Sequence, residues 1–69
     1  MKQISLRSEY ITLGQMLKVG DCIDSGGQAK AFLAEIRIKV NGEKENRRGR
    51  KLYAGDVVDV DGYGTFMIG

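Results

Sequence analysis

The 69 residues of this chain are enough for one domain only, and its single cysteine excludes an intramolecular disulfide. The chain has no histidine and no apolar run near the roughly 20 residues of a membrane helix, which argues against a metal site, histidine-based catalysis and membrane insertion. The net charge is only +2, but residues 30–51 contain eight basic and three acidic side chains, so a local charge of +5 stands against −3 elsewhere.

Alternating polar and apolar residues predict a first strand at Lys2–Arg7, and this segment lacks the apolar stretch of a signal peptide. Thr12 begins a first helix, because it stands at capping-box spacing from Gln15. The buried stripe of this helix is predicted to consist of Leu13, Met16 and Leu17. Gly20 and Asp21 end it.

A second helix is predicted to begin at Ser25, which repeats the capping-box spacing with Gln28. Its apolar stripe is predicted to consist of Ala29, Phe32, Leu33 and Ile36. Gly26 and Gly27 each lower helix propensity by about 1 kcal/mol in the first turn, which indicates that something other than helix stability selects them. Few residues separate the two helices, so we expect them to pack as a pair.

From Ile36 onward the apolar period changes from 3.6 to 2, which predicts a strand that runs to Asn41. The pair Asn41-Gly42 predicts a hairpin, because both central positions of a type I′ turn need positive φ. The segment 44–51 is too polar for the core, and two further strands are predicted at Val57–Asp61 and Thr65–Ile68. Residues 1–69 therefore form one α+β domain with a short N-terminal strand, two packed helices and then a small antiparallel sheet.

The segment Lys44–Lys51 carries the main functional signal, because five of its eight residues are cationic. Lysine and arginine gain affinity for phosphates by releasing counterions, and arginine adds bidentate geometry. The adjoining strand face is also basic, and the alternative interpretation is a solvated loop that only aids solubility. We expect a phosphate-binding surface that consists of Arg37, Lys39, Lys44, Arg47, Arg48, Arg50 and Lys51.

The start of the second helix is another candidate site, because its free N–H groups and its dipole favour an anion, and its glycines permit close approach. The candidate residues are Ser25, Gly26, Gln28 and Lys30. An ordinary N-cap is the alternative for Ser25. Tyr53 is a candidate for stacking on an exposed base, against the commoner role of a ring packed beside a strand with its hydroxyl in water.

Between Thr12 and Val60 the chain resembles the alpha-L RNA-binding motif of small-subunit ribosomal protein S4, and it looks most like the small stand-alone bacterial members. The resemblance covers about 49 of the 69 residues and depends on an ordered set of short elements. These elements are Leu17, Ser25 with Gln28-Ala29, Val40-Asn41-Gly42, Arg47-Arg48-Gly49-Arg50-Lys51 and Gly55-Asp56-Val57-Val58.

The resemblance implies a non-catalytic module that binds structured RNA by phosphate and shape contacts. The lone cysteine and the missing signal peptide favour the cytoplasm, and we expect a monomer without cofactor or metal. Ribosomal RNA is the expected target, and ribosome or ribosome-assembly factors are further expected partners. The implied RNA contacts are Ser25, Gln28, Lys30, Asn41 and the arginine-rich segment. Two departures stand out: many members have arginine where Gly26 stands, and Ile36-Arg37 replace the usual glycine after the second helix.

Two other classes of function fit parts of the pattern. A β-grasp sulfur carrier shares the Val-Asn-Gly and Gly-Asp turns and would use the C-terminal Gly69, although Ile68 stands where a second tail glycine is expected. A protein-interaction adaptor on ribosome or replication factors would use the same basic face. DNA shares the phosphate chemistry, but a protein that reads shape should prefer A-form or folded RNA to B-form DNA.

Overall fold

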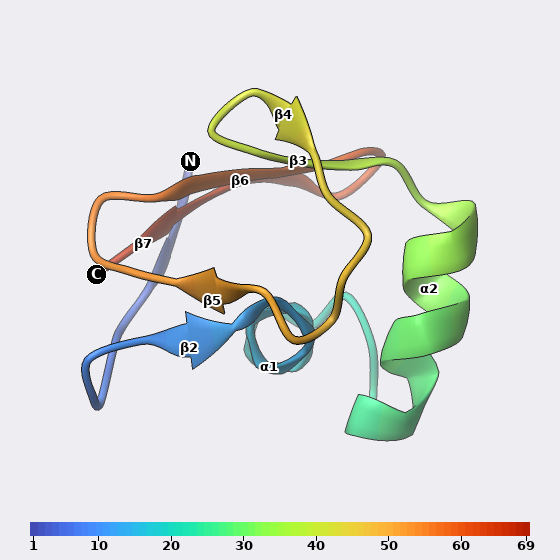
Figure 1. Cartoon of the computed structure of the whole chain (residues 1–69), viewed down its shortest axis with the longest axis horizontal. Coiled ribbons are helices and arrows are strands. Elements are labelled where there is room, and N and C mark those ends of the chain that lie inside the picture. Colours follow the sequence, from blue (N-terminus) through green and yellow to red (C-terminus); the bar gives the residue numbers. More distant parts are fainter.

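The computed structural model describes residues 1–69 and places a mixed five-stranded sheet against the first helix (Figure 1). In spatial order the strands of this sheet are β1 (Lys2–Ile4), β7 (Gly64–Ile68), β6 (Val57–Val60), β3 (Ile38–Val40) and β4 (Glu43–Lys44). A separate two-stranded sheet consists of β2 (Ile11–Thr12) and β5 (Lys51–Leu52). The helices are α1 (Leu13–Val19) and α2 (Ala29–Glu35), and the predicted α+β class is confirmed.

Helix α1 forms as predicted from its capping box. The hydroxyl of Thr12 accepts a hydrogen bond from the backbone N–H of Gln15 at 3.3 Å, and Gln15 Oε1 accepts from the backbone N–H of Thr12 at 3.0 Å. Gly20 is the C-cap residue, and Asp21 follows with a φ of 61°. The predicted stripe of Leu13, Met16 and Leu17 is fully buried.

The second helix differs from the prediction at both ends. Its first turn is a 3-10 turn, η1 (Gly26–Gln28), and the α-helix begins only at Ala29. The side chain of Gln28 reaches back as expected, and its Oε1 accepts from the backbone N–H groups of Ser25 at 3.0 Å and Asp24 at 2.6 Å. After Glu35 the backbone at Ile36 is already extended, but strand pairing begins only at Ile38, two residues later than predicted.

The sheet confirms the hairpin and shortens the first strand. Asn41 and Gly42 have φ values of 52° and 85°, as a type I′ turn requires. Strand β1 ends at Ile4, not at Arg7, and it pairs with β7 in parallel, with Ile4 opposite Ile68. The strands that follow the second helix form an antiparallel sheet as predicted, and parallel pairing is found only for β1, whose direction the alternation does not give.

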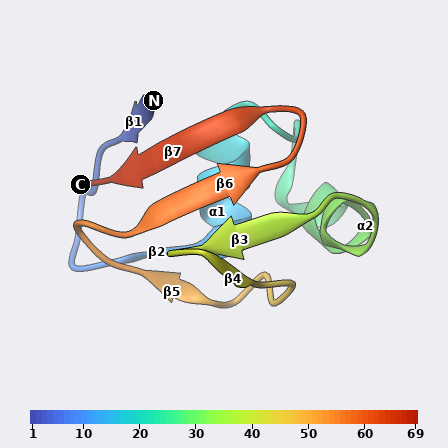
Figure 2. The ribbon, with the colours of Figure 1, turned by 90° about the horizontal axis from the view of Figure 1, so that it is seen from above.

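One core of fifteen buried apolar residues lies between the inner face of the sheet and α1. Figure 2 shows α1 behind the sheet and α2 beside it, past the start of β3, while no helix covers the outer face. Neither helix has the length and apolar composition needed to cross a membrane.

Candidate functional site

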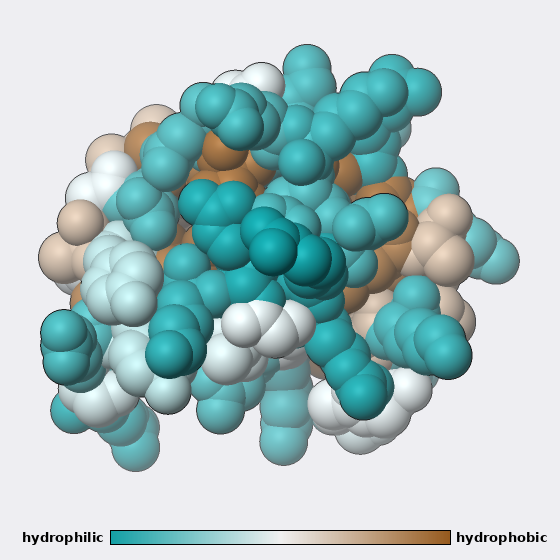
Figure 3. All heavy atoms as spheres, in the orientation of Figure 1, coloured by the Kyte–Doolittle hydropathy of each residue, from teal (hydrophilic) through white to brown (hydrophobic).

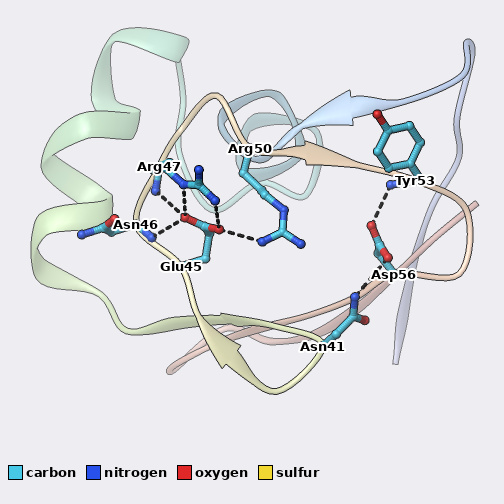
Figure 4. A network of polar contacts seen from close by, with 7 residues as sticks. All are labelled: Asn41, Glu45, Asn46, Arg47, Arg50, Tyr53 and Asp56. Carbon is cyan, nitrogen blue, oxygen red and sulfur yellow. Dashed lines mark hydrogen bonds and ion pairs between the residues drawn. The ribbon is translucent and has the colours of Figure 1, made fainter.

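The connection between β4 and β5, residues 45–50, is here called the arginine loop, and it is built around a buried carboxylate. The side chain of Glu45 is only 6% exposed. It accepts side-chain hydrogen bonds from Arg47 Nε at 2.9 Å, Arg47 Nη2 at 3.0 Å and Arg50 Nη1 at 2.7 Å (Figure 4). It also accepts from the backbone N–H groups of Asn46 at 3.2 Å and Arg47 at 3.1 Å.

The burial of Glu45 corrects the expectation that segment 44–51 lies wholly outside the core. Hydrogen bonds from Arg47 lower the pKa of Glu45 well below its ordinary range, and Arg50 adds to this against the opposing effect of burial. Both arginines still reach solvent, because their side chains are 72% and 34% exposed. The carboxylate therefore fixes the arginines at the surface of the molecule.

Helix α1 holds the same loop from its other side. The backbone N–H of Leu13 donates to the carbonyl of Arg50 at 2.8 Å, and that of Gly14 donates to the carbonyl of Arg48 at 2.9 Å. These N–H groups lie in the first turn of the helix and have no partner within it. A Cβ atom at position 14 would lie 3.3 Å from the carbonyl oxygen of Arg48, so glycine permits this close approach. In the sequence, this contact is indicated only by the presence of a glycine in the first turn of a helix.

The arginine loop and α2 bring predicted cations together from distant parts of the sequence. Lys30 on α2 and Arg48 on the loop line one shallow depression, together with Asn46. Neither cation takes part in an ion pair within the protein. A second depression is lined by Arg47, Gly49, Arg50, Lys51 and Tyr53. Figure 3 shows that hydrophilic atoms cover most of this face of the molecule, and apolar atoms appear only in the gaps between them.

The predicted cations of the sheet form a more mixed surface. Arg37 and Lys44 border a third depression beside the loop. Lys39 lies opposite both Lys44 and Asp59 in the strand register, and it shares a depression with Arg37 and the acidic residues Asp59 and Asp61. The carboxylates of Asp59 and Asp61 therefore weaken the positive electrostatic potential around Lys39.

Asn41 has a structural role that the sequence pattern did not reveal. Its side-chain amide donates to Asp56 Oδ1 at 3.0 Å, and its side-chain oxygen accepts from the backbone N–H of Val57 at 2.9 Å. Asp56 Oδ2 in turn accepts from the backbone N–H of Tyr53 at 2.8 Å (Figure 4). Asn41 thus links the hairpin to β6 and, through Asp56, to the end of β5.

The start of the second helix is exposed, and of its predicted contact residues only Lys30 lines a depression with the arginine loop. Ser25, Gly26 and Gln28 are all exposed, and the amide oxygen of Gln28 is already occupied by two backbone N–H groups. Nothing lies within 4 Å of a Cβ atom built at Gly26, so packing does not require glycine there.

The C-terminal glycine is bonded to the first strand. The N–H of Gly69 donates to the carbonyl of Ile4 at 2.8 Å, and its carbonyl accepts from Gln3 Nε2 at 2.6 Å. A sulfur carrier needs this glycine on a free arm, and these bonds argue against that alternative.

Comparison with known proteins gives related sequences over nearly the whole chain. The S4 domain family matches residues 4–68. The chain is 58% identical over 65 residues to "Probable ribosome maturation protein RlbA" of Bacillus subtilis (strain 168), across 94% of this chain and 92% of that protein. It is 34% identical over 59 residues to "Putative RNA-binding protein YbcJ" of Escherichia coli (strain K12), across 86% and 84% of the two chains.

Proposed function

This chain belongs to the S4 domain family, and from that premise we propose that it is a non-catalytic module that binds structured RNA by its phosphates and its shape. The observation that carries the proposal is the arginine loop, whose cations are held at the surface by buried Glu45 and by the start of α1. The names of the two relatives refer to ribosome maturation and RNA binding, and they support ribosomal RNA as the target. We propose that the protein acts in the cytoplasm as a monomer.

The fixed loop gives the proposal its physical basis. A flexible arginine loses side-chain freedom when it binds a phosphate, and an arginine already held by Glu45 has less freedom to lose. Arg48 and Lys30 stand on two different elements around one depression, so they can contact phosphates that lie apart along an RNA backbone. Each phosphate that is neutralised releases counterions, so affinity should fall steeply as salt rises.

The chemistry of the surface supports a non-catalytic role. The carboxylate whose pKa is most strongly shifted, Glu45, is kept ionised by two arginines and enclosed by them, which makes it a poor general base or acid. Its partners make it a positioning group for cations.

Fluorescence anisotropy with a folded ribosomal RNA fragment and a matched DNA duplex, across a salt series, tests the proposal. The variant is Lys30→Ala with Arg48→Ala, because neither side chain pairs with Glu45 and the fold should survive. The control is Arg7→Ala with Lys18→Ala, which removes the same charge from exposed positions outside both depressions of the arginine loop.

The wild type should prefer the RNA, and the test variant should lower the slope of log affinity against log salt by about 1.5, while the control leaves it near the wild-type value. Equal losses of RNA affinity in the variant and the control would mean that only the net charge of the protein matters. Equal binding of DNA would contradict recognition of shape. Failure of the wild type to bind either nucleic acid at moderate salt would overturn the proposal itself.

A further inference from the structure

The small β2–β5 sheet exposes two tyrosines side by side. Ile11 lies opposite Leu52 in the register, and Tyr10 and Tyr53 are the next residues beyond this pair. Leu52 is fully buried and Ile11 partly buried, whereas Tyr10 and Tyr53 are 39% and 44% exposed. Their ring centroids lie 6.0 Å apart, and the ring planes are inclined by 51°.

Cations surround this pair on the side of the arginine loop. Lys51 Nζ lies 4.8 Å from the ring centroid of Tyr10, so its ammonium group covers one face of that ring. Tyr53 borders the depression that also contains Arg47 and Arg50. The backbone N–H of Tyr53 donates to Asp56, which holds the backbone from which this ring extends.

The chemistry of the surface limits the ligand to one class. A quaternary ammonium group also binds aromatic rings, but the neighbouring cations would repel it. A paired base in a duplex has no free ring face to offer a protein, whereas an unpaired nucleotide offers a flat base and a phosphate together. Aromatic rings beside basic side chains match that combination.

We propose that Tyr10, Tyr53 and Lys51 form a binding site for a single unpaired nucleotide next to a paired RNA segment that lies on the arginine loop. This inference rests on the proposed RNA-binding function. The base stacks on Tyr53, because Lys51 already covers a face of Tyr10, and Tyr10 forms the wall of the site. Lys51 and Arg50 contact the flanking phosphates.

A purely structural role for the pair is the competing explanation, because aromatic residues opposite each other stabilise small sheets. That role would make the tyrosines important for folding but would give no preference among RNAs. The two explanations therefore differ in whether the protein discriminates an unpaired nucleotide from paired ones.

The experiment compares two RNA hairpins that are identical except for one bulged nucleotide, with affinities measured by fluorescence anisotropy. The wild type should bind the bulged hairpin at least about fivefold more tightly than the fully paired one. Tyr53→Leu should abolish this difference, because the site then has no aromatic face on which the unpaired base can stack. Tyr53→Phe is the matched control, because it keeps the ring and should keep the difference.

A second measurement covers the case in which Tyr53→Leu fails to fold. The chain has no tryptophan, so Tyr53→Trp places a sole indole reporter in the site. The bulged hairpin should quench its fluorescence, and the paired hairpin should not. Equal quenching by both hairpins would overturn the inference.

The results separate the inference from the function on which it rests. If the wild type binds both hairpins equally well, the nucleotide site is wrong and RNA binding stands. A preference that survives in Tyr53→Leu would likewise overturn it. If neither hairpin binds, the proposed function fails, and the nucleotide site fails with it.

Discussion

The arginine loop and the start of the second helix have similar sequence signals but differ in how they are held. Both contain cations and glycine, and both were predicted from sequence as phosphate sites. In the loop, Glu45 accepts five hydrogen bonds and two N–H groups of α1 bind loop carbonyls. At the helix start, Gly26 is exposed and has no neighbour near a built Cβ atom.

This difference shows that local charge does not by itself identify an organised binding surface. An acidic residue inside a basic segment lowers the net charge, yet here it gives the segment its shape. A glycine near a helix start can serve a close contact, as Gly14 does, or face open solvent, as Gly26 does. Substitutions at these positions test whether RNA affinity depends more on the fixed position of the side chains or on their charge.

The largest effect is expected from Glu45→Ala. Removal of the carboxylate leaves two loop N–H groups and two arginines without their acceptor, and we expect a loss of about 2 kcal/mol in the free energy of unfolding. Thermal unfolding followed by circular dichroism should show a fall of roughly 10 °C in the melting temperature. A melting temperature equal to that of the wild type would mean that Glu45 does not hold the loop.

RNA binding by the same variant separates shape from charge. Glu45→Ala makes the protein more positive by one unit, so simple electrostatics predicts tighter binding. If the loop must be held in place, affinity for structured RNA should fall instead, at a temperature where the variant is folded. A rise in affinity would favour charge over organisation.

Acid should remove the contribution of Glu45 to stability. Its pKa in the folded protein is lowered by Arg47 first and then Arg50, so its stabilising effect is complete above the ordinary value of 4.5 and is lost as pH falls below it. The loss should approach about 1.4 kcal/mol per pH unit. Urea unfolding of wild type and Glu45→Gln between pH 7 and pH 3 measures it, and a constant difference between the two would contradict the assignment.

A smaller effect is expected from Gly14→Val, compared with the same substitution at Gly26. A valine at position 14 would press on the backbone and side chain of Arg48, and we expect a loss of about 1–2 kcal/mol in the free energy of unfolding. Gly26→Val enters open space and should be nearly neutral. Urea unfolding of both variants measures the two losses. Equal losses in the free energy of unfolding would show that the contact between Gly14 and Arg48 does not require glycine.

The smallest effect is expected from Gly26→Arg, which restores the arginine found in many alpha-L motifs. The new side chain has room and lies on the same helix segment as Lys30, so RNA affinity should rise by about two- to fivefold and the salt slope by about 0.8. Ser5→Arg, at another exposed position, adds equal charge as a control. Equal gains in both would indicate non-specific attraction.

Features set by neighbouring residues were predictable from the sequence. The Thr12–Gln15 cap, the buried stripe of α1 and the turn at Asn41-Gly42 each depend on contacts a few positions apart. The glycine pair Gly26-Gly27 was interpreted as allowing an anion to come close, and the 3-10 turn that contains it was not predicted.

Features that depend on distant parts of the chain were missed. The backbone N–H of Glu45 donates to the carbonyl of Ile38 at 3.0 Å, which places this residue beside β3. No pattern within segment 44–51 contains that contact. Asn41 was expected to contact RNA, and its bonds to Asp56 and Val57 join residues that are far apart in sequence. Its predicted RNA contact stays a prediction.

The parallel pairing of β1 with β7 has a consequence for folding during synthesis. A ribosome delivers β1 first, but its only partner in the sheet, β7, comes from the far end of the sequence. Hairpins with short connections, such as β3–β4 and β6–β7, close at a lower entropic cost and should form earlier. Strand β1 therefore pairs last, and the side chain of Ile4 is not buried in the core until β7 has left the exit tunnel.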